Sequence, residues 1–280
     1  MPDTDAPGLD VGEGLLLIGC GKMGGALLQG WLAQGLDPTK AVVIEPNPEA
    51  LLGMGSKTLR HITDTQMPPG DFMPSVVVFA VKPQMMGAAL PLYRAYVREA
   101  CVFLSVAAGT TIASMTAALG DNAAVVRAMP NTPAAVGRGM TVLAANANAS
   151  TGQRDLCQAL MAGVGRTDWV DDEALMDPVT GVSGSGPAYV FWFVECLAQA
   201  GVDAGLPTEL AMTLARQTVA GAGELLYQSP EAAGQLRQNV TSPAGTTYEA
   251  LQVLMAEDGL QPLMSRAVAA ATRRSRELAG

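Results

Sequence analysis

One stretch near the amino end of the sequence, GLLLIGCGKMGGALLQGWLAQG at residues 14–35, constrains the fold more than any other. A run of apolar residues leads into Gly19, Gly21 and Gly24, and apolar residues at helical spacing follow. A strand, a tight turn and a helix in this order bring backbone amides and a helix N-terminus to one point. We expect this turn to bind the diphosphate of a dinucleotide; the alternative is a glycine turn with a structural role only.

Further strands are expected at residues 41–47, 75–83, 100–109, 123–133, 139–146 and 165–170. The first three of these, like the run at the amino end, are apolar runs without polar alternation. Strands that are covered on both faces have this pattern, which is typical of parallel sheets in doubly wound folds. The sequence therefore predicts an α/β domain with a mainly parallel, doubly wound sheet that ends near residue 170.

Beyond Asp171 the apolar residues recur at helical spacing. We place a domain boundary here, with a dinucleotide-binding domain over residues 1–170 and an all-α domain over residues 171–280. The helix predicted over 187–200 is apolar almost all round, which indicates a buried helix. Glu195 is its one charge, so we expect that carboxylate to be paired or to lie at a ligand or subunit contact. The other predicted helices cover 208–227 and 246–256, and a last one ends at 273–278.

Composition narrows the class of partner. The formal net charge is −9 and Lys and Arg are scarce, which argues against nucleic acid or an anionic membrane and favours a small ligand. The longest apolar stretch, at 187–194, is too short for a membrane span, and the acidic N-terminus does not resemble a secretory signal. The four cysteines form no CxxC pair, so we expect no metal site and reduced thiols in a cytoplasmic protein.

Glu45 ends the second predicted strand, where dinucleotide-binding domains place an acid that bonds the ribose. A carboxylate there accepts from the 2′-hydroxyl of NAD and repels the 2′-phosphate of NADP, and no Lys or Arg occurs in the next ten residues. This favours NAD. The alternative is that Glu45 points to solvent and Asn47 contacts the adenosine, which leaves the choice between NADPH and NADH open.

Few residues are available for acid/base catalysis. Lys82 lies within AVKPQ, the run that ends a predicted strand, and it is the last lysine of the chain, so the second domain has no lysine base. Cofactor contact and a surface position are equally good interpretations of Lys82. His61 is the only histidine and lies in a polar stretch, where we expect a solvated loop. Reduction of a ketone needs a proton donor, whereas reduction of a protonated imine needs only the hydride.

The run SPAGTT at residues 242–247 supplies small and hydroxylated residues just before a predicted helix. Backbone amides that converge at a helix N-terminus favour an anion, so this loop is a candidate carboxylate site without arginine. The alternative is an ordinary Ser-Pro turn in which Thr246 or Thr247 caps the helix.

Seven segments together resemble pyrroline-5-carboxylate reductases, in order and over about residues 18–275. They are IGCGKMG, FAVKPQ, SVAAG, RAMPNTPA, VGRGMT, TGVSGSGPAYVF and NVTSPAGTTYEAL. The resemblance implies a Rossmann domain followed by a helical domain that binds substrate and through which subunits form a homodimer, often a decamer of five dimers. It also implies reduction of 1-pyrroline-5-carboxylate to L-proline, the last step of proline biosynthesis, with NADPH or NADH as the hydride donor.

The family also implies roles for individual residues. The loop holds the substrate carboxylate through Ser242, Ala244, Gly245, Thr246 and Thr247, and the Thr247 hydroxyl bonds the ring nitrogen, which makes it the catalytic candidate. Asn239 matches a residue that reaches the cofactor from the helical domain. With the motif residues discussed above, the cofactor set is Ile18, Gly19, Cys20, Gly21, Lys22, Met23, Gly24, Glu45, Asn47, Ala80, Val81, Lys82, Ala107, Ala108, Gly109 and Asn239.

Three positions depart from the family. Ala244 replaces the glycine that is commonest in the loop, and EPNPE replaces the basic or hydroxylated residue of relatives that use NADP. A glutamate that contacts substrate in some relatives falls near Pro230, and whether the neighbouring Glu231 substitutes for it is left open. Two rival functions follow from the first motif alone. One is a β-hydroxyacid dehydrogenase, which relies on a lysine in the helical domain, and this chain has none there. The other is a dinucleotide sensor that binds the cofactor without turnover. Another imine reductase would share the same glycine turn.

Overall fold

The computed structural model describes residues 8–52, 58–63, 68 and 70–279. The chain divides into two units. The first consists of the chain up to Gly184 together with the segment from Ala271 onward, and the second is Ser185–Ala270. Each unit is described by itself. The predicted boundary near Asp171 stays a prediction about where the cofactor-binding and dimerisation regions divide.

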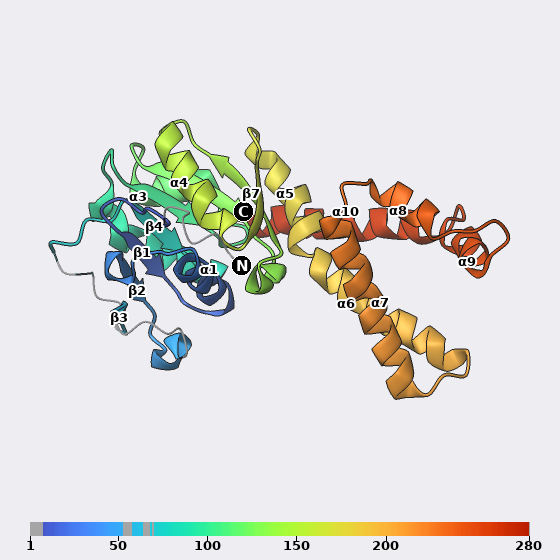
Figure 1. Ribbon diagram of the computed structural model, residues 1–280. Helices are drawn as coiled ribbons and strands as arrows, with labels where there is room; N and C mark the ends of the chain where they lie inside the picture. Colours follow the sequence, from blue (N-terminus) through green and yellow to red (C-terminus); the bar gives the residue numbers. More distant parts are fainter. Residues whose placement is uncertain (1–7, 53–57, 64–67, 69, 280) are drawn as a thin grey trace. The chain divides into compact units, whose positions relative to one another are not determined.

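The first unit is built on one sheet (Figure 1). Its strands are β1 Leu15–Ile18, β2 Ala41–Ile44, β3 Arg60–Ile62, β4 Val76–Phe79, β5 Val102–Ser105, β6 Ala124–Met129, β7 Gly139–Ala145 and β8 Gly165–Trp169. Their order in the sheet is β3-β2-β1-β4-β5-β6-β7-β8, and every neighbouring pair is parallel except β6 and β7. The chain order reverses between β1 and β4, which is where open α/β sheets bind ligands at the carboxyl ends of their strands.

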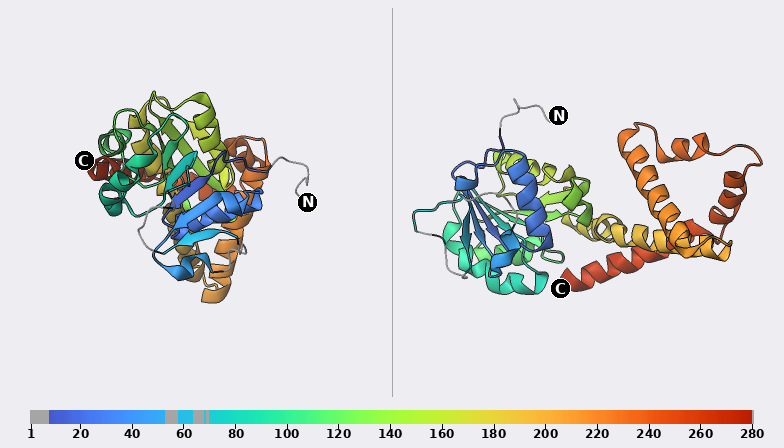
Figure 2. Two further views of the ribbon diagram at one scale, coloured as in Figure 1. Left: turned by 90° about the vertical axis from the view of Figure 1, so that its left-hand side faces the viewer. Right: turned by 60° about the horizontal axis from the view of Figure 1, so that its bottom comes forward.

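Helices cover both faces of this sheet (Figure 2). They are α1 Lys22–Ala33, α2 Met86–Ala89, α3 Ile112–Leu119, α4 Thr151–Ala162 and α5 Met176–Val179. On one face Leu15 and Leu17 pack in a cluster with Trp31 of α1 and Leu160 of α4. On the other face residues such as Leu16 pack with α2, α3 and the 3-10 helix Leu90–Tyr96. Adjacent residues of one strand enter opposite cores, so the absence of polar alternation is explained and the predicted fold class is confirmed.

The second unit is helical (Figure 1). It contains α6 Gly186–Asp203, α7 Thr208–Gln228, α8 Ala233–Asn239, α9 Thr246–Leu254 and the beginning of α10 Leu260–Ala279. Four of these helices are predicted from the sequence, and the short α8 is not. Helices α6 and α7 pack closely, since a Cβ added at Gly201 would lie 3.2 Å from the Cβ of Ala211.

The prediction that the helix over 187–200 is buried is wrong for the single chain. Along α6 only Ala198 is buried, and Glu195 is exposed together with Phe191 and Trp192. The physical reason is the small size of this helical unit, in which only Ala198, Ala211 and Ala215 are buried. The apolar sequence of α6 indicates that its surface is covered in the assembled protein, but it does not indicate whether the same chain or another chain covers it.

Candidate active site

The glycine turn between β1 and α1 has the geometry that close approach to a ligand requires. Gly19 has φ +89°, and a Cβ on it would lie 2.9 Å from the carbonyl of Ala80. A Cβ at Gly24 would lie 2.2 Å from the carbonyl oxygen of Gly19, so this glycine lets α1 pack directly on the turn. A Cβ at Gly21 would meet nothing within 4 Å, which leaves the backbone of the turn open on that side.

Helix α1 begins on this open side. Gly21 is its N-cap, no side chain caps it, and its first turn carries no acidic residue. The first amides of an α-helix have no partner within the helix, and the helix dipole adds positive potential there. The turn and the start of α1 therefore form an anion site of the kind that holds a dinucleotide diphosphate.

Glu45 does not point away from this turn. Its Oε2 accepts a hydrogen bond from the amide of Cys20 at 2.7 Å, and its Oε1 accepts one from the amide of Asn47 at 2.9 Å. The Asn47 side chain is also engaged, because its Oδ1 accepts from the amide of Glu49 at 3.0 Å.

Burial raises the pKa of the Cys20 thiol to about 11, and the nearby charge of Glu45 adds to this effect, so the thiol is protonated at neutral pH.

The other predicted cofactor residues of this unit lie on the neighbouring strand ends. The amide of Ala80 donates to the carbonyl of Ile18 at 2.8 Å, which places the Ala80–Lys82 segment next to the glycine turn. Lys82 is exposed. Strand β5 continues into Ala107, Ala108 and Gly109, where the Ala107 amide donates to Ser105 Oγ at 3.2 Å and Gly109 has φ +73°. The structure thus brings three predicted segments to one edge of the sheet.

The predicted substrate loop belongs to the second unit and precedes α9. The amide of Gly245 donates to the carbonyl of Ser242 at 3.1 Å and closes a tight turn. Pro243 is its second residue and Ala244, with φ +53°, its third, a combination typical of type II turns. Ala244 is the only residue other than glycine with positive φ in the part of the chain that the structure describes. This left-handed conformation explains why a glycine is suitable at this position.

The start of α9 resembles the start of α1. Gly245 is the N-cap, and no side chain caps the helix, so Thr246 and Thr247 do not serve as caps. A Cβ at Gly245 would lie 2.3 Å from Ser242 Oγ and 3.1 Å from the Ser242 carbonyl oxygen, so a larger residue would crowd the turn. The first amides of α9 therefore have no partner within the helix, and the loop that precedes them carries hydroxyl groups, a combination suited to a carboxylate.

Asn239 ends α8 in the second unit. Its Oδ1 accepts from Gln235 Nε2 at 2.8 Å, and its Nδ2 donates to Glu231 Oε2 at 3.2 Å. The side chain is therefore held by neighbours along its own helix and by Glu231. Its predicted contact with a cofactor stays a prediction.

The expectation for His61 is wrong. The residue lies on β3, a three-residue edge strand that pairs with β2, and it is half-buried. Its Nε2 lies 2.9 Å from the carbonyl oxygen of Glu45. A short polar strand at the edge of a sheet has no apolar pattern that would reveal it, so the sequence indicated a loop.

Sequence reasoning also missed a buried ion pair. Arg127 on β6 is 3% exposed, and its Nη1 lies 2.8 Å from Glu173 Oε1. The same oxygen accepts from the amide of Ile112 at the start of α3 at 2.9 Å. The available signal was the lone charge inside the apolar run AAVVRAM, because a charge in a buried strand requires a partner.

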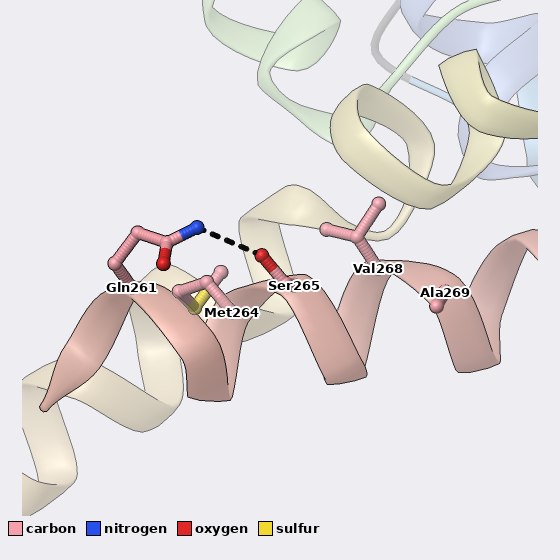
Figure 3. Close-up of a pocket in the computed structure, with 5 residues that line it drawn as sticks. All are labelled: Gln261, Met264, Ser265, Val268 and Ala269. Atoms are coloured by element: carbon pink, nitrogen blue, oxygen red, sulfur yellow. Dashed lines mark hydrogen bonds between the residues drawn. The ribbon is translucent and has the colours of Figure 1, made fainter. Parts of the chain in front are cut away.

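A shallow hollow lies along α10 in the second unit (Figure 3). Its lining comes from one helix, and Gln261 Nε2 donates there to Ser265 Oγ at 2.9 Å. The lining residues are Gln261, Met264, Ser265, Val268 and Ala269. None of them is a predicted site residue.

Over the described residues, every helix is either too short or too polar to cross a membrane.

Comparison with known proteins supports this reading of the two regions. Residues 173–278 match the family described as pyrroline-5-carboxylate reductase dimerisation. Residues 15–109 match the family described as NADP oxidoreductase, coenzyme F420-dependent. The chain is 37% identical to a pyrroline-5-carboxylate reductase of Pseudomonas aeruginosa, with 95% of this chain and 96% of the relative covered. It is 38% identical to the enzyme of Synechocystis, with 94% and 97% covered.

Solved structures agree. A pyrroline-5-carboxylate reductase from Coxiella burnetii superposes with a TM-score of 0.87 at 34% identity and covers 95% of this chain and 98% of its own. The Plasmodium falciparum pyrroline carboxylate reductase, solved with NADP bound, gives a TM-score of 0.79 at 27% identity, with 98% and 100% covered. The resemblance seen in the sequence motifs is thereby confirmed, and the chain belongs to the pyrroline-5-carboxylate reductase family.

Proposed function

We propose that this protein reduces 1-pyrroline-5-carboxylate to L-proline with NADPH or NADH, the last step of proline biosynthesis. The observation that carries the proposal is the loop Ser242–Thr247, a tight turn that leads into the uncapped helix α9 in a chain of this family. The loop offers amides and hydroxyls to a small carboxylic acid, and none of its own side chains is ionisable.

The residues at the sheet edge fit a dinucleotide. The open backbone at Gly21 and the start of α1 would hold the diphosphate, with Lys22 and Met23 in the first turn of that helix. Glu45 is placed to accept from the ribose of the adenosine, and the segments Ala80–Lys82 and Ala107–Gly109 border the same edge. NAD(P)H supplies a hydride when bound.

The substrate end works by orientation. The amides at the start of α9 hold the carboxylate, and the Thr247 hydroxyl bonds the ring nitrogen and fixes which carbon faces the donor. The imine C=N bond of the protonated ring accepts the hydride at C5 and becomes a C–N single bond, so the nitrogen ends as an amine and needs no further proton. A strong acid at this point is therefore unnecessary, which agrees with the loop's composition.

Oligomers form through the second unit, all of which lies within the match to the dimerisation family. We propose a homodimer through these helices, and a decamer of five such dimers. The large apolar side chains that α6 exposes support the homodimer, because a large apolar surface on one chain is normally covered by another chain. On α6 they are Val190, Phe191, Trp192, Phe193 and Leu197. We also propose a cytoplasmic location, where the four free cysteines stay reduced.

A charge on α6 tests the dimer. Trp192 is 64% exposed in the single chain, and Trp192→Glu should raise the dimer dissociation constant at least about a hundredfold, since aromatic residues dominate such interfaces. Sedimentation velocity across a concentration series measures this. Leu92→Glu makes the same kind of change on an exposed leucine of the first unit and should leave the oligomer intact. Equal behaviour of the two variants would show that α6 is not at the interface.

Two glycine variants test the cofactor site separately from the fold. Gly21→Ala adds a methyl group in open space at a backbone with φ −69°, so stability should stay within about 0.5 kcal/mol while NAD(P)H affinity falls at least about tenfold. Gly24→Ala forces a Cβ against the Gly19 carbonyl and should cost about 1–3 kcal/mol of unfolding free energy. Urea denaturation and nucleotide fluorescence measure the two quantities. Unchanged nucleotide affinity in Gly21→Ala would contradict the assignment.

The activity itself is tested with the purified protein, 1-pyrroline-5-carboxylate and each nicotinamide cofactor. We expect loss of absorbance at 340 nm and an equal amount of L-proline measured by chromatography. A dinucleotide sensor would bind the cofactor without consuming it. A β-hydroxyacid dehydrogenase would oxidise a hydroxyacid with NAD and leave the pyrroline untouched.

A further inference from the structure

The carboxylate of Glu45 is held by both of its oxygens at the edge of the cofactor site. Strands β1 and β2 are parallel with Ile18 opposite Ile44, so Glu45 begins beside Gly19. From there its side chain reaches across to the glycine turn and accepts the Cys20 amide at 2.7 Å, while its other oxygen accepts the Asn47 amide at 2.9 Å. A carboxylate has about four acceptor positions, so it retains capacity for a further donor.

The backbone of Glu45 is held from the opposite side by β3. Its amide donates to the carbonyl of Ile62 at 3.0 Å, and His61 Nε2 lies 2.9 Å from its carbonyl oxygen. A carbonyl oxygen only accepts, so Nε2 carries the hydrogen in this contact. The histidine thereby anchors the peptide from which the carboxylate extends. This gives a role to the only histidine of the chain, which the proposed reaction leaves unused.

Among the residues that the structure describes after β2, the charge is negative. The segment Pro46–Leu52 that follows Glu45 contains no Lys or Arg and adds a second carboxylate, Glu49. Arg60 is exposed and pairs with Val42, two residues before the strand end. Lys22 is the first residue of α1, on the side assigned to the diphosphate. A 2′-phosphate carries one and a half to two negative charges at neutral pH, and beside a fixed carboxylate it is repelled. A 2′-hydroxyl donates to the same carboxylate.

We infer that Glu45, positioned by His61, makes this enzyme select NADH over NADPH. The inference rests on the proposed function, because it concerns the cofactor of that reaction. It decides between the two alternatives left open by the sequence, since the Glu45 side chain is turned toward the glycine turn and the Asn47 side chain is engaged with Glu49.

Direct binding of the two nucleotides to the full protein, without substrate, tests this. Isothermal titration should give NADH about a hundredfold tighter than NADPH in the wild type. Glu45→Gln keeps the shape and removes the charge, so NADPH affinity should rise about tenfold and NADH affinity should fall about tenfold. Glu49→Gln removes the same charge from a neighbouring carboxylate and should keep the ratio of affinities within about twofold. A wild type that binds NADPH as tightly as NADH would overturn the inference, as would an unchanged ratio in Glu45→Gln.

His61 is tested as a positioning residue. His61→Ala should lower the NADH to NADPH ratio several-fold, because the Glu45 peptide loses its anchor, and His61→Gln should restore part of it through its amide donor. If Glu45→Gln fails to fold, Glu45→Asp serves instead: it keeps the charge, shortens the reach to Cys20 and should still lower the ratio. If the ratio of NADH to NADPH affinity were the same in the wild type, His61→Ala and His61→Gln, His61 would have no part in cofactor selection. Failure of both nucleotides to bind would contradict the proposed function, whereas equal binding of the two contradicts only the role of Glu45.

Discussion

Thr247→Ala is expected to lower kcat for pyrroline-5-carboxylate reduction by about ten- to a hundredfold while NAD(P)H affinity stays unchanged. Thr247 is the second residue of α9, beside the amides assigned to the substrate carboxylate. Loss of a hydroxyl that bonds a charged or polarised nitrogen costs about 1.5–3 kcal/mol, and each 1.4 kcal/mol corresponds to a factor of ten. Steady-state kinetics and nucleotide titration separate the two effects.

Thr247→Ser is the matched control for this prediction. It keeps the hydroxyl and removes only the methyl group, so kcat should stay within a few-fold of the wild type. Thr246→Ala removes the neighbouring hydroxyl from the same turn and should raise KM more than it lowers kcat, because Thr246 contributes to holding the carboxylate. If Thr247→Ala turned over at the wild-type rate, the hydroxyl would have no part in orienting the ring.

Glu173→Ala should lower the free energy of unfolding by about 3 kcal/mol. Arg127 is 3% exposed and its Nη1 lies 2.8 Å from Glu173 Oε1, so the alanine variant leaves a buried charge without its partner. Removal of one member of a buried pair costs about 3–5 kcal/mol, and the lower end applies because the Glu173 side chain is 28% exposed. The variant also removes an acceptor for the amide of Ile112. Urea denaturation of the full chain measures the change.

A double variant separates the charge from the packing. Arg127→Met with Glu173→Leu removes both charges and fills similar volume, so it should be more stable than Glu173→Ala, since a buried pair replaced by apolar residues is often neutral. A loss below about 1 kcal/mol in Glu173→Ala would mean that water reaches Arg127 and replaces the carboxylate.

The doubly wound sheet was predictable because its physical cause is visible in single residues. Leu15 and Leu17 enter one core and Leu16 enters the other, so a strand covered on both faces contains no polar residue. The glycine turn was predictable for a related reason, because Gly19 and Gly24 occupy places where a side chain would collide with backbone.

Features that depend on contacts distant in sequence were not predictable. The partner of Arg127 lies 46 residues further along the chain, and His61 takes its role only because β3 pairs with β2. The exposure of Trp192 had a different cause. Its helix is as apolar as a core helix, and a surface reserved for a second chain has the same composition as one covered by its own chain.

We propose that a turn of small and hydroxylated residues holds the substrate acid without an ionisable catalyst. A crystal structure of the enzyme with L-proline and oxidised cofactor would show where the acid binds. The proline carboxylate should lie on the amides of Gly245–Thr247, and the ring nitrogen should lie on the Thr247 hydroxyl. A proline carboxylate held by an arginine elsewhere in the protein, with the Ser242–Thr247 loop free of ligand, would contradict it.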